Sequence, residues 1–136
     1  MWLWRHINSI PITYQGYGGH GNQIRDILDI NDLCLLIKEQ ISKISKINNH
    51  TFNVGGGSSN ALSLKELTGY CEKITKNKIK FKKKIKTSNY DLRYYVTDNK
   101  KIYSIYKWRV SKKLDTIINE TFQSLNKNKK ALKKLI

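Results

Sequence analysis

The chain has 136 residues, 39% of them apolar, and its 26 Lys and Arg against 10 Asp and Glu give a formal net charge of +16. This length fits one domain with a buried core and is too short for a complete two-domain enzyme. The apolar fraction argues against disorder, and every apolar run is shorter than the ~20 residues of a membrane helix. The start, MWLWRHINSIPI, is unlike a signal peptide, so we expect a cytoplasmic protein without a membrane partner.

The first elements expected along the chain are a helix and a strand. Apolar residues favour a short helix over 2–7, and ITYQGYG over 12–18 predicts a strand that enters a glycine turn. The segment QIRDILDI, residues 23–30, fits a strand or a helix. Asn31 and Asp32 are good N-caps for the long amphipathic helix that follows.

The middle of the chain predicts a strand, a helix and two extended segments. TFNVGGG over 51–57 reads as a short strand that ends in a glycine turn. Ser63, with Glu66 three residues later, forms a capping box that starts a helix. The lysine-rich segment 77–86 suits an exposed edge strand, where lysines block further pairing. Residues 91–98, DLRYYVTD, are expected to be extended.

The last third of the chain predicts two helices and a tail. Asp98 is expected to cap a short helix that ends near Trp108, which we assign to packing. A final helix is expected over 114–125. The fold class is therefore mixed α/β, with short strands and three to four helices, a folded portion over 1–125 and a frayed basic tail over 126–136.

Cysteine and histidine offer no recognisable site. Cys34 and Cys71 lie in apolar helical patterns, where a small buried thiol is the expected role. Two thiols do not make a disulfide framework, and the three histidines are far apart in the sequence. We expect no metal site.

The stretch GYGGHG matches the glycine spacing of the dinucleotide-binding fingerprint, with glycines at Gly16, Gly18 and Gly21. That motif needs a buried strand before it, a helix that begins inside the glycine run, and a carboxylate after the next strand. Here the best helix start is ten residues past Gly21, and the expected strand over 51–57 ends without a carboxylate. We therefore expect a glycine-rich hairpin between two strands, and no cofactor loop.

Tyr103 and Lys107 have the spacing of the catalytic pair of short-chain dehydrogenases, in which the lysine lowers the proton affinity of the tyrosine. The pair lies at the end of a short helix, and no suitable serine-containing strand precedes it. In a chain with eight tyrosines, we interpret this spacing as chance.

The order of several motifs resembles a known family. GYGGHGNQIRDILDINDL, then FNVGGG and SLKEL, then YDLRYYVTDNKKI and YKW resemble the C-terminal half of extended short-chain dehydrogenase/reductases, the NAD-dependent nucleotide-sugar epimerases and dehydratases. The resemblance extends from about residue 10 to residue 125. It implies the substrate-binding part of the fold, with the Rossmann half absent from this chain.

The resemblance also implies the cofactor and partners. In the family, NAD and the catalytic tyrosine and lysine belong to the Rossmann half, so this chain is expected to bind no cofactor and to have no epimerase activity alone. The expected ligand is a nucleotide sugar, most plausibly a CDP-sugar. A separate chain that supplies the Rossmann half is a further possible partner.

Five residues are expected to bind the substrate, four of them at positions that match the family. Arg25 is the arginine expected on the diphosphate, where a planar fork of donors suits phosphate oxygens; the alternative is a surface ion pair with a neighbouring aspartate. Ser63 begins a helix that can face phosphate, or is a plain N-cap. Gln23 would share the face of Arg25 on a strand. Ser88 and Asp91 match the ends of the family's Arg-Pro-Gly-Asp stretch.

Two departures from the family pattern bear on substrate binding. Ser88 stands where the family has arginine, so one phosphate clamp is missing unless Arg93 replaces it. Asp29 stands where the family often has histidine.

Two other functions remain open at this point. A small nucleic-acid-binding protein would use the lysines together with exposed aromatic side chains, of which the candidates are Phe81, Tyr90, Tyr94 and Tyr95. A lysine-rich surface without a partner explains the charge more simply, so nucleic acid is not the favoured partner. A remnant without function would expose an apolar face, to which Trp2, Trp4 and Tyr14 are expected to contribute.

Overall fold

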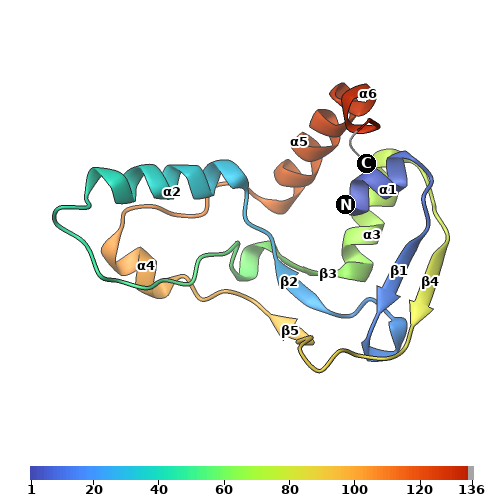
Figure 1. Ribbon diagram of the computed structural model, residues 1–136, viewed down its shortest axis with the longest axis horizontal. Coiled ribbons are helices and arrows are strands. Elements are labelled where there is room, and N and C mark those ends of the chain that lie inside the picture. Colours follow the sequence, from blue (N-terminus) through green and yellow to red (C-terminus); the bar gives the residue numbers. More distant parts are fainter. Residues whose placement is uncertain (135–136) are drawn as a thin grey trace.

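The computed structural model describes residues 1–134 of the chain, which form an elongated molecule with two lobes joined by a small sheet (Figure 1). In chain order the elements are α1 Trp2–Ile7, β1 Ile12–Gln15, β2 Ile24–Asp26, α2 Ile30–Ser42, β3 Ala61–Ser63, α3 Leu64–Thr75, β4 Phe81–Lys84, β5 Tyr94–Tyr95, α4 Lys100–Ile105, α5 Leu114–Lys127 and α6 Lys129–Leu132. The mixed α/β class is confirmed, with six α-helices in the described chain where three to four were expected.

One lobe contains both termini of the described chain. α1 and α5 pack on α3 around Leu3, Cys71 and Ile118. Beside these helices β1 and β4 form a parallel two-stranded sheet, in which Ile12 pairs with Phe81. All four residues of β4 are exposed, as expected for a lysine-rich edge strand.

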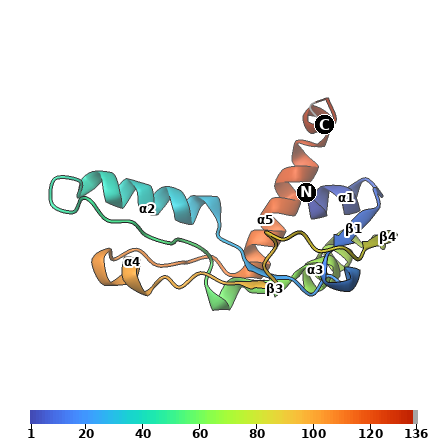
Figure 2. The same cartoon turned by 60° about the horizontal axis from the view of Figure 1, so that its bottom comes forward.

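The other lobe is an arm formed by α2, α4 and the loops beside them (Figure 2). Its core consists of Leu36 from α2, Ile102 from α4, and Tyr106 and Trp108 just after α4. The packing role expected for Trp108 is confirmed, since its side chain is buried in this cluster.

A three-stranded sheet in the order β3-β2-β5 joins the two lobes. β2 runs antiparallel to β3 and parallel to β5, so Arg25 lies on the central strand between Leu62 and Tyr95. The ambiguous segment 23–30 therefore contains a strand and then the start of α2.

The expected glycine hairpin is wrong. β1 pairs with β4 and β2 pairs with β3 and β5, so the glycine stretch connects two different sheets through a short 3-10 turn at Tyr17–Gly19. Gly21 has a φ of 70°, and a Cβ there would lie 2.9 Å from the ring of Tyr14 and 3.2 Å from the amide nitrogen of Lys65. The glycines allow the chain to pass closely over the start of α3.

Several expected helix and strand boundaries need correction. α2 begins at Ile30 and its N-cap is Asp29, whose side chain accepts a hydrogen bond from the Asn31 amide, rather than Asn31 or Asp32. Residues 51–57 form no strand among the described residues. Asn99 is the N-cap of α4, although Asp98 accepts a hydrogen bond from the Lys100 amide at 2.9 Å.

The environments of two aromatic residues and a thiol also differ from expectation. Trp4 and Tyr14 are buried in the lobe and are not part of an exposed face. Cys71 is buried as expected, whereas Cys34 is exposed. Burial raises the pKa of the Cys71 thiol to about 12, so this thiol stays protonated and is a poor nucleophile or metal ligand near neutral pH.

The basic tail is partly helical. α5 continues to Lys127, past the expected end at residue 125, and α6 spans Lys129–Leu132. The end of the expected tail, residues 135–136, lies outside the described residues. No helix within residues 1–134 is long and apolar enough to span a membrane.

Candidate functional site

A pocket of about 420 Å³ lies where the two sheets and α3 meet. It is lined by residues from one lobe, from the central sheet and from the loop between β4 and β5: Trp2, Thr13, Gln15, Gln23, Arg25, Leu64, Ser88 and Asp91. Four of the five residues expected from the sequence, all except Ser63, thus line one concave surface. Leu64, the first residue of α3, is on that surface as well.

The Arg25 guanidinium is held firmly at this pocket. Its Nη2 donates to Asp91 Oδ1 at 2.9 Å and to the Leu92 carbonyl at 2.6 Å, and its Nη1 donates to the Ile24 carbonyl at 2.6 Å. Arg25 therefore pairs with Asp91, and not with the neighbouring aspartates that the alternative interpretation named. The three bonds use three of the five N–H donors of the guanidinium, which leaves donors for a bound anion.

Gln23 is buried beside Arg25, and one of its hydrogen-bonding atoms has no partner. Its Nε2 donates to the Gln15 carbonyl and lies 3.4 Å from Asp91 Oδ2. Because both of these atoms are acceptors, the NH2 group and not the oxygen of the Gln23 amide faces them. Its Oε1 is buried without a hydrogen-bond partner among residues 1–134. A buried acceptor left without a partner costs about 1–3 kcal/mol, which an O–H or N–H group from a ligand would relieve.

Ser88 and Asp91 lie on a loop that the glycine turn holds in place. The Tyr17 hydroxyl donates to the Asp91 carbonyl, and the Tyr17 amide donates to Thr87 Oγ1 at 2.8 Å. The Asp91 amide donates to the Ser88 carbonyl at 3.1 Å, which closes a turn between the two residues. The glycine stretch thus supports the candidate site by holding this loop.

Ser63, the last residue of β3, does not line this pocket and lies instead on a second concave surface with Ile24 and Glu66. Its hydroxyl accepts a hydrogen bond from the Glu66 amide at 3.1 Å and donates to Glu66 Oε2 at 2.8 Å, so the expected capping box is present. Bonds from the Ser63 amide and hydroxyl hold the pKa of Glu66 below its usual value. The Ser63 hydroxyl is therefore engaged by its own helix.

Arg93 does not take the place of the missing arginine in this conformation. Its side chain is exposed and is not among the residues that line the pocket, while its carbonyl accepts a hydrogen bond from the Ile24 amide at 3.0 Å. Arg25 is the arginine that the structure brings to this pocket.

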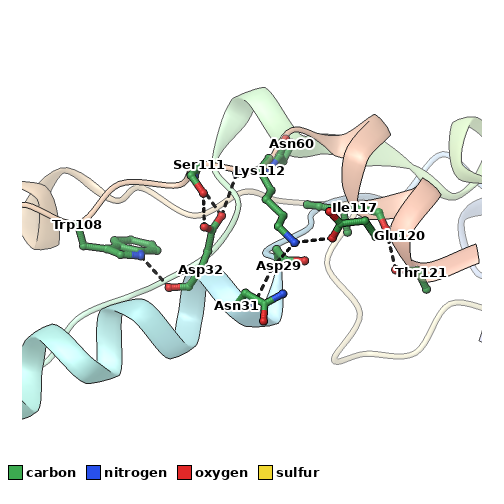
Figure 3. Close-up of polar contacts among 10 residues, drawn as sticks. All are labelled: Asp29, Asn31, Asp32, Asn60, Trp108, Ser111, Lys112, Ile117, Glu120 and Thr121. Carbon is green, nitrogen blue, oxygen red and sulfur yellow. Dashed lines mark hydrogen bonds and ion pairs between the residues drawn. The ribbon is translucent and has the colours of Figure 1, made fainter. Parts of the chain in front are cut away.

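Asp32 has a structural role that the sequence did not reveal. Its side chain is 1% exposed and accepts hydrogen bonds from the Ser111 amide at 3.0 Å, the Lys112 amide at 3.1 Å and the Ser111 hydroxyl (Figure 3). Its carbonyl accepts from Trp108 Nε1 at 2.8 Å. No local pattern could indicate these contacts, because the partners are more than 75 residues apart in the sequence.

Asp29 belongs to the same junction. Besides capping α2, it lies 3.4 Å from Lys112 Nζ, which also contacts Glu120 of α5 (Figure 3). Burial favours the neutral acid, but the Asn31 amide and the Lys112 ammonium hold the pKa of Asp29 below its usual value. Asp29 and Lys112 thus link the start of α2 to α5.

The two cofactor-like patterns do not fit their motifs. After the glycine turn the chain enters β2, and the next α-helix begins at Ile30, so the glycine run of the described chain contains a 3-10 turn but not the start of an α-helix. Tyr103 lies on α4, while Lys107 lies beyond its end at Ile105, and the tyrosine ring packs against Trp108 and Arg109. Neither stretch therefore forms the cofactor-binding or catalytic site that its residue spacing suggests.

Comparison with known proteins gives one sequence relative and many structural ones. No family model matches the sequence. CDP-paratose 2-epimerase from Salmonella typhi is 35% identical over 90 residues, which cover 66% of this chain and 26% of the epimerase.

Two solved structures illustrate the likeness in fold. An epimerase from Methanothermobacter thermautotrophicus matches with a TM-score of 0.81 at 16% identity, over 98% of this chain and 38% of that one. The dTDP-glucose 4,6-dehydratase from Bacillus anthracis, solved in complex with NAD, matches with a TM-score of 0.74 at 19% identity, over 95% of this chain and 39% of that one.

The chain therefore spans about a quarter of its curated relative and about two fifths of these solved chains. The relatives are nucleotide-sugar epimerases and dehydratases, and the similarity is confined to a portion of each. In sequence and in fold, the chain is therefore similar to part of the extended short-chain dehydrogenase/reductases of the NAD-dependent epimerase/dehydratase family.

Proposed function

We propose that the pocket at Arg25 binds the diphosphate of a nucleotide sugar, and that a CDP-sugar is the preferred ligand. The observation that carries the proposal is the convergence of Gln23, Arg25, Ser88 and Asp91 on one pocket beside the start of α3. The preference for cytidine rests on the curated relative, which is named for a CDP-sugar.

Each residue has a distinct part in this proposal. Arg25 presents its remaining N–H donors to phosphate oxygens, and Asp91 fixes the plane of the guanidinium. Gln23 Oε1 and the Ser88 hydroxyl offer hydrogen-bonding groups to the sugar or the ribose. Ser63 acts through the helix that it caps, whose first amides and dipole favour an anion nearby.

In this proposal the chain binds and orients the nucleotide sugar, and groups outside this chain carry out the redox steps. The family reaction moves a hydride to NAD, and this chain's glycine run and Tyr103 do not form the corresponding sites. We expect the purified chain to show no NAD-dependent turnover of a CDP-sugar. Turnover by the chain alone would contradict this division of roles.

Calorimetric titration with CDP tests the binding. Arg25→Gln should weaken CDP binding by about 10- to 100-fold, since a charged hydrogen bond is worth about 1.5–3 kcal/mol. Arg25→Lys should also weaken it, because the ammonium lacks the planar fork. Arg109→Gln removes the same charge from the arm, far along the chain from the pocket residues, and should leave the affinity within about 2-fold. Equal losses of CDP affinity from Arg25→Gln and Arg109→Gln would show that the binding is only general charge attraction, and would contradict the proposal.

A second function, nucleic-acid binding, has one observation in its favour. The four aromatic side chains named for it, Phe81, Tyr90, Tyr94 and Tyr95, are all exposed. Neighbouring residues of a strand point to opposite faces, however, so Tyr94 and Tyr95 cannot share one stacking surface. Oligonucleotide binding that falls steeply between low and high salt would support this function, and binding of CDP alone would leave the nucleotide-sugar proposal in place.

A further inference from the structure

Another pocket, of about 440 Å³, lies between α3 and the sheet of β1 and β4. It opens on the opposite face of β1 from the candidate functional site, because Tyr14 lines it whereas Thr13 and Gln15 line that site. Small-molecule sites have volumes of about 300–1,000 Å³. The space beside Tyr14 is therefore a separate concavity, large enough for a small ligand.

A glycine in the middle of α3 keeps this pocket open. Gly69 lines the pocket, and a Cβ added to it would meet no atom within 4 Å. A glycine inside a helix lowers stability relative to alanine. The two usual structural reasons for such a glycine, a positive φ and close contact with a neighbouring element, do not apply at Gly69. The glycine therefore leaves room for a ligand, although it weakens the helix.

The aromatic wall of the pocket is held in place by hydrogen bonds. The Tyr14 hydroxyl donates to Thr68 Oγ1 at 2.6 Å, and Thr68 Oγ1 donates in turn to the Leu64 carbonyl at 2.9 Å. The rings of Tyr14 and Phe81 pack with their centroids 5.3 Å apart. Because Tyr14 is 5% exposed and Phe81 is 53% exposed, Phe81 is the ring that a ligand would contact.

Positive charge gathers at the end of the pocket that is lined by His20, Lys65 and Lys83. Neither lysine forms an ion pair within residues 1–134. A Cβ at Gly19 would lie 2.8 Å from the Cβ of Lys83. A Cβ at Gly21 would lie 3.2 Å from the amide nitrogen of Lys65. The glycine turn thus brings both lysines and the histidine to one end, which suits a dianion such as a phosphate monoester.

The rest of the pocket fixes which way such a ligand would lie. Glu72 lines the pocket seven residues after Lys65, about 10 Å further along α3, and its carboxylate would repel a phosphate. Phe81 precedes Lys83 by two residues on β4, about 7 Å away on the same face. A phosphate at the lysine end would therefore place an attached aromatic ring against Phe81.

We propose that this pocket is a second ligand site, for a small aromatic phosphate monoester. The phosphate binds Lys65 and Lys83 beside His20, and the ring lies against Phe81 in the space that Gly69 leaves open. The site goes beyond the proposed function, because it lies on the other face of β1 and takes part in neither sugar nor diphosphate binding.

A titration with phenyl phosphate, followed through amide chemical shifts, tests this site. Saturable shifts should appear at Gly69 and Lys83. Inorganic phosphate, which lacks the ring, and benzyl alcohol, which lacks the charge, should each bind at least about 10-fold more weakly. The absence of saturable shifts at these residues would overturn the proposal, as would equal affinity for inorganic phosphate or for benzyl alcohol.

Two lysines of β4 form a matched pair of variants. Lys83→Gln should weaken phenyl phosphate binding by about 5-fold or more, because a charged hydrogen-bond donor is lost. Lys82→Gln should change it by less than about 2-fold, since this neighbour removes the same charge from the other face of the strand. Equal losses of affinity would show attraction to the basic surface in general and refute the site.

Gly69→Leu tests the space itself. Leucine should fill the pocket and weaken phenyl phosphate binding by about 10-fold or more, and the melting temperature should stay the same or rise because leucine favours the helix. Unchanged affinity would contradict the proposal. A lower melting temperature would also contradict it, because the glycine would then serve the fold.

One further variant separates this site from the pocket at Arg25, which also attracts phosphate. Arg25→Gln should leave the affinity for phenyl phosphate within about 2-fold, whatever it does to CDP binding. If Arg25→Gln removed phenyl phosphate binding and Lys83→Gln did not, the ligand would occupy the pocket at Arg25, and the second site would be refuted while the proposed function stood.

Discussion

At the scale of single residues, buried polar side chains decide how distant segments meet. Asp32 receives two amides and a hydroxyl from residues 111 and 112, and its carbonyl receives the indole N–H of Trp108. Buried donors left without a partner are costly, so this one carboxylate holds the chain after α4 against the start of α2. Arg25 and Asp91 make a comparable link across the candidate site.

The structural role of Asp32 predicts a large loss of stability on a nearly isosteric change. Asp32→Asn keeps one oxygen for the Ser111 and Lys112 amides, but it removes the charge from these hydrogen bonds and turns an N–H group towards the Ser111 hydroxyl, which now donates to the carboxylate. The change should lower the free energy of unfolding by about 1–2 kcal/mol. Urea unfolding followed by tryptophan fluorescence measures the loss. Asp115→Asn, at an exposed residue in the first turn of α5, should change stability by less than about 0.5 kcal/mol; equal effects of the two variants would refute the role of Asp32.

At the scale of elements, local signals predicted the helices better than the strand pairing. The capping box at Ser63 and the lysine-rich strand at 81–84 were predictable, because a cap lies within one turn and an edge strand shows in its alternation. The pairing of β1 with β4, 69 residues further on, has no local signature. For that reason the glycine stretch was mistaken for a hairpin.

The segment 51–57 shows a second kind of error, in which a strand was predicted from a local pattern and the described chain has none there. Its alternation is that of a strand, but a strand also needs a neighbour with which to pair, and none lies beside it within residues 1–134. The residues of the candidate site were predicted on other grounds. Arg25, Ser88 and Asp91 came from the family resemblance, and Gln23 came from the alternation of a strand. The contacts of Asp29 and Asp32 depend on the folded chain and could not be derived from spacing.

The contact between α2 and α5 depends on pH in a predictable way. Lys112 touches Glu120 and Asp29, and the hydrogen bond to Glu120 in particular raises the pKa of Lys112. The pKa of Asp29 is lowered, so its ion pair stabilises the fold above the unfolded carboxyl pKa and is lost as the pH falls through the folded value. Lys112→Met should lower stability at pH 7, and its difference from wild type should shrink as the pH falls below the usual aspartate pKa of 3.8 and through the lowered pKa of folded Asp29.

Parallel unfolding curves at pH 7 and pH 3 measure this effect. Lys113→Met is the control, since it removes the same charge at the neighbouring exposed residue. A stability difference between wild type and Lys112→Met that is the same at both pH values would contradict the role given to Asp29.

At the scale of the whole molecule, the pocket exists because one lobe, the central sheet and the loop between β4 and β5 meet. Trp2 and Thr13 come from that lobe, Arg25 from the central sheet, and Asp91 from the loop that the glycine turn holds. The arm of α2 and α4 extends away from β1 and α3 (Figure 1).

The most direct measurement is a map of amide chemical shifts as CDP is added to the purified chain. The account predicts saturable shifts that cluster at Gln23, Arg25, Leu64 and Asp91, around the pocket. Shifts that do not saturate and spread instead over the lysines of 78–86 would show general attraction of an anion to a basic surface, and would contradict the account.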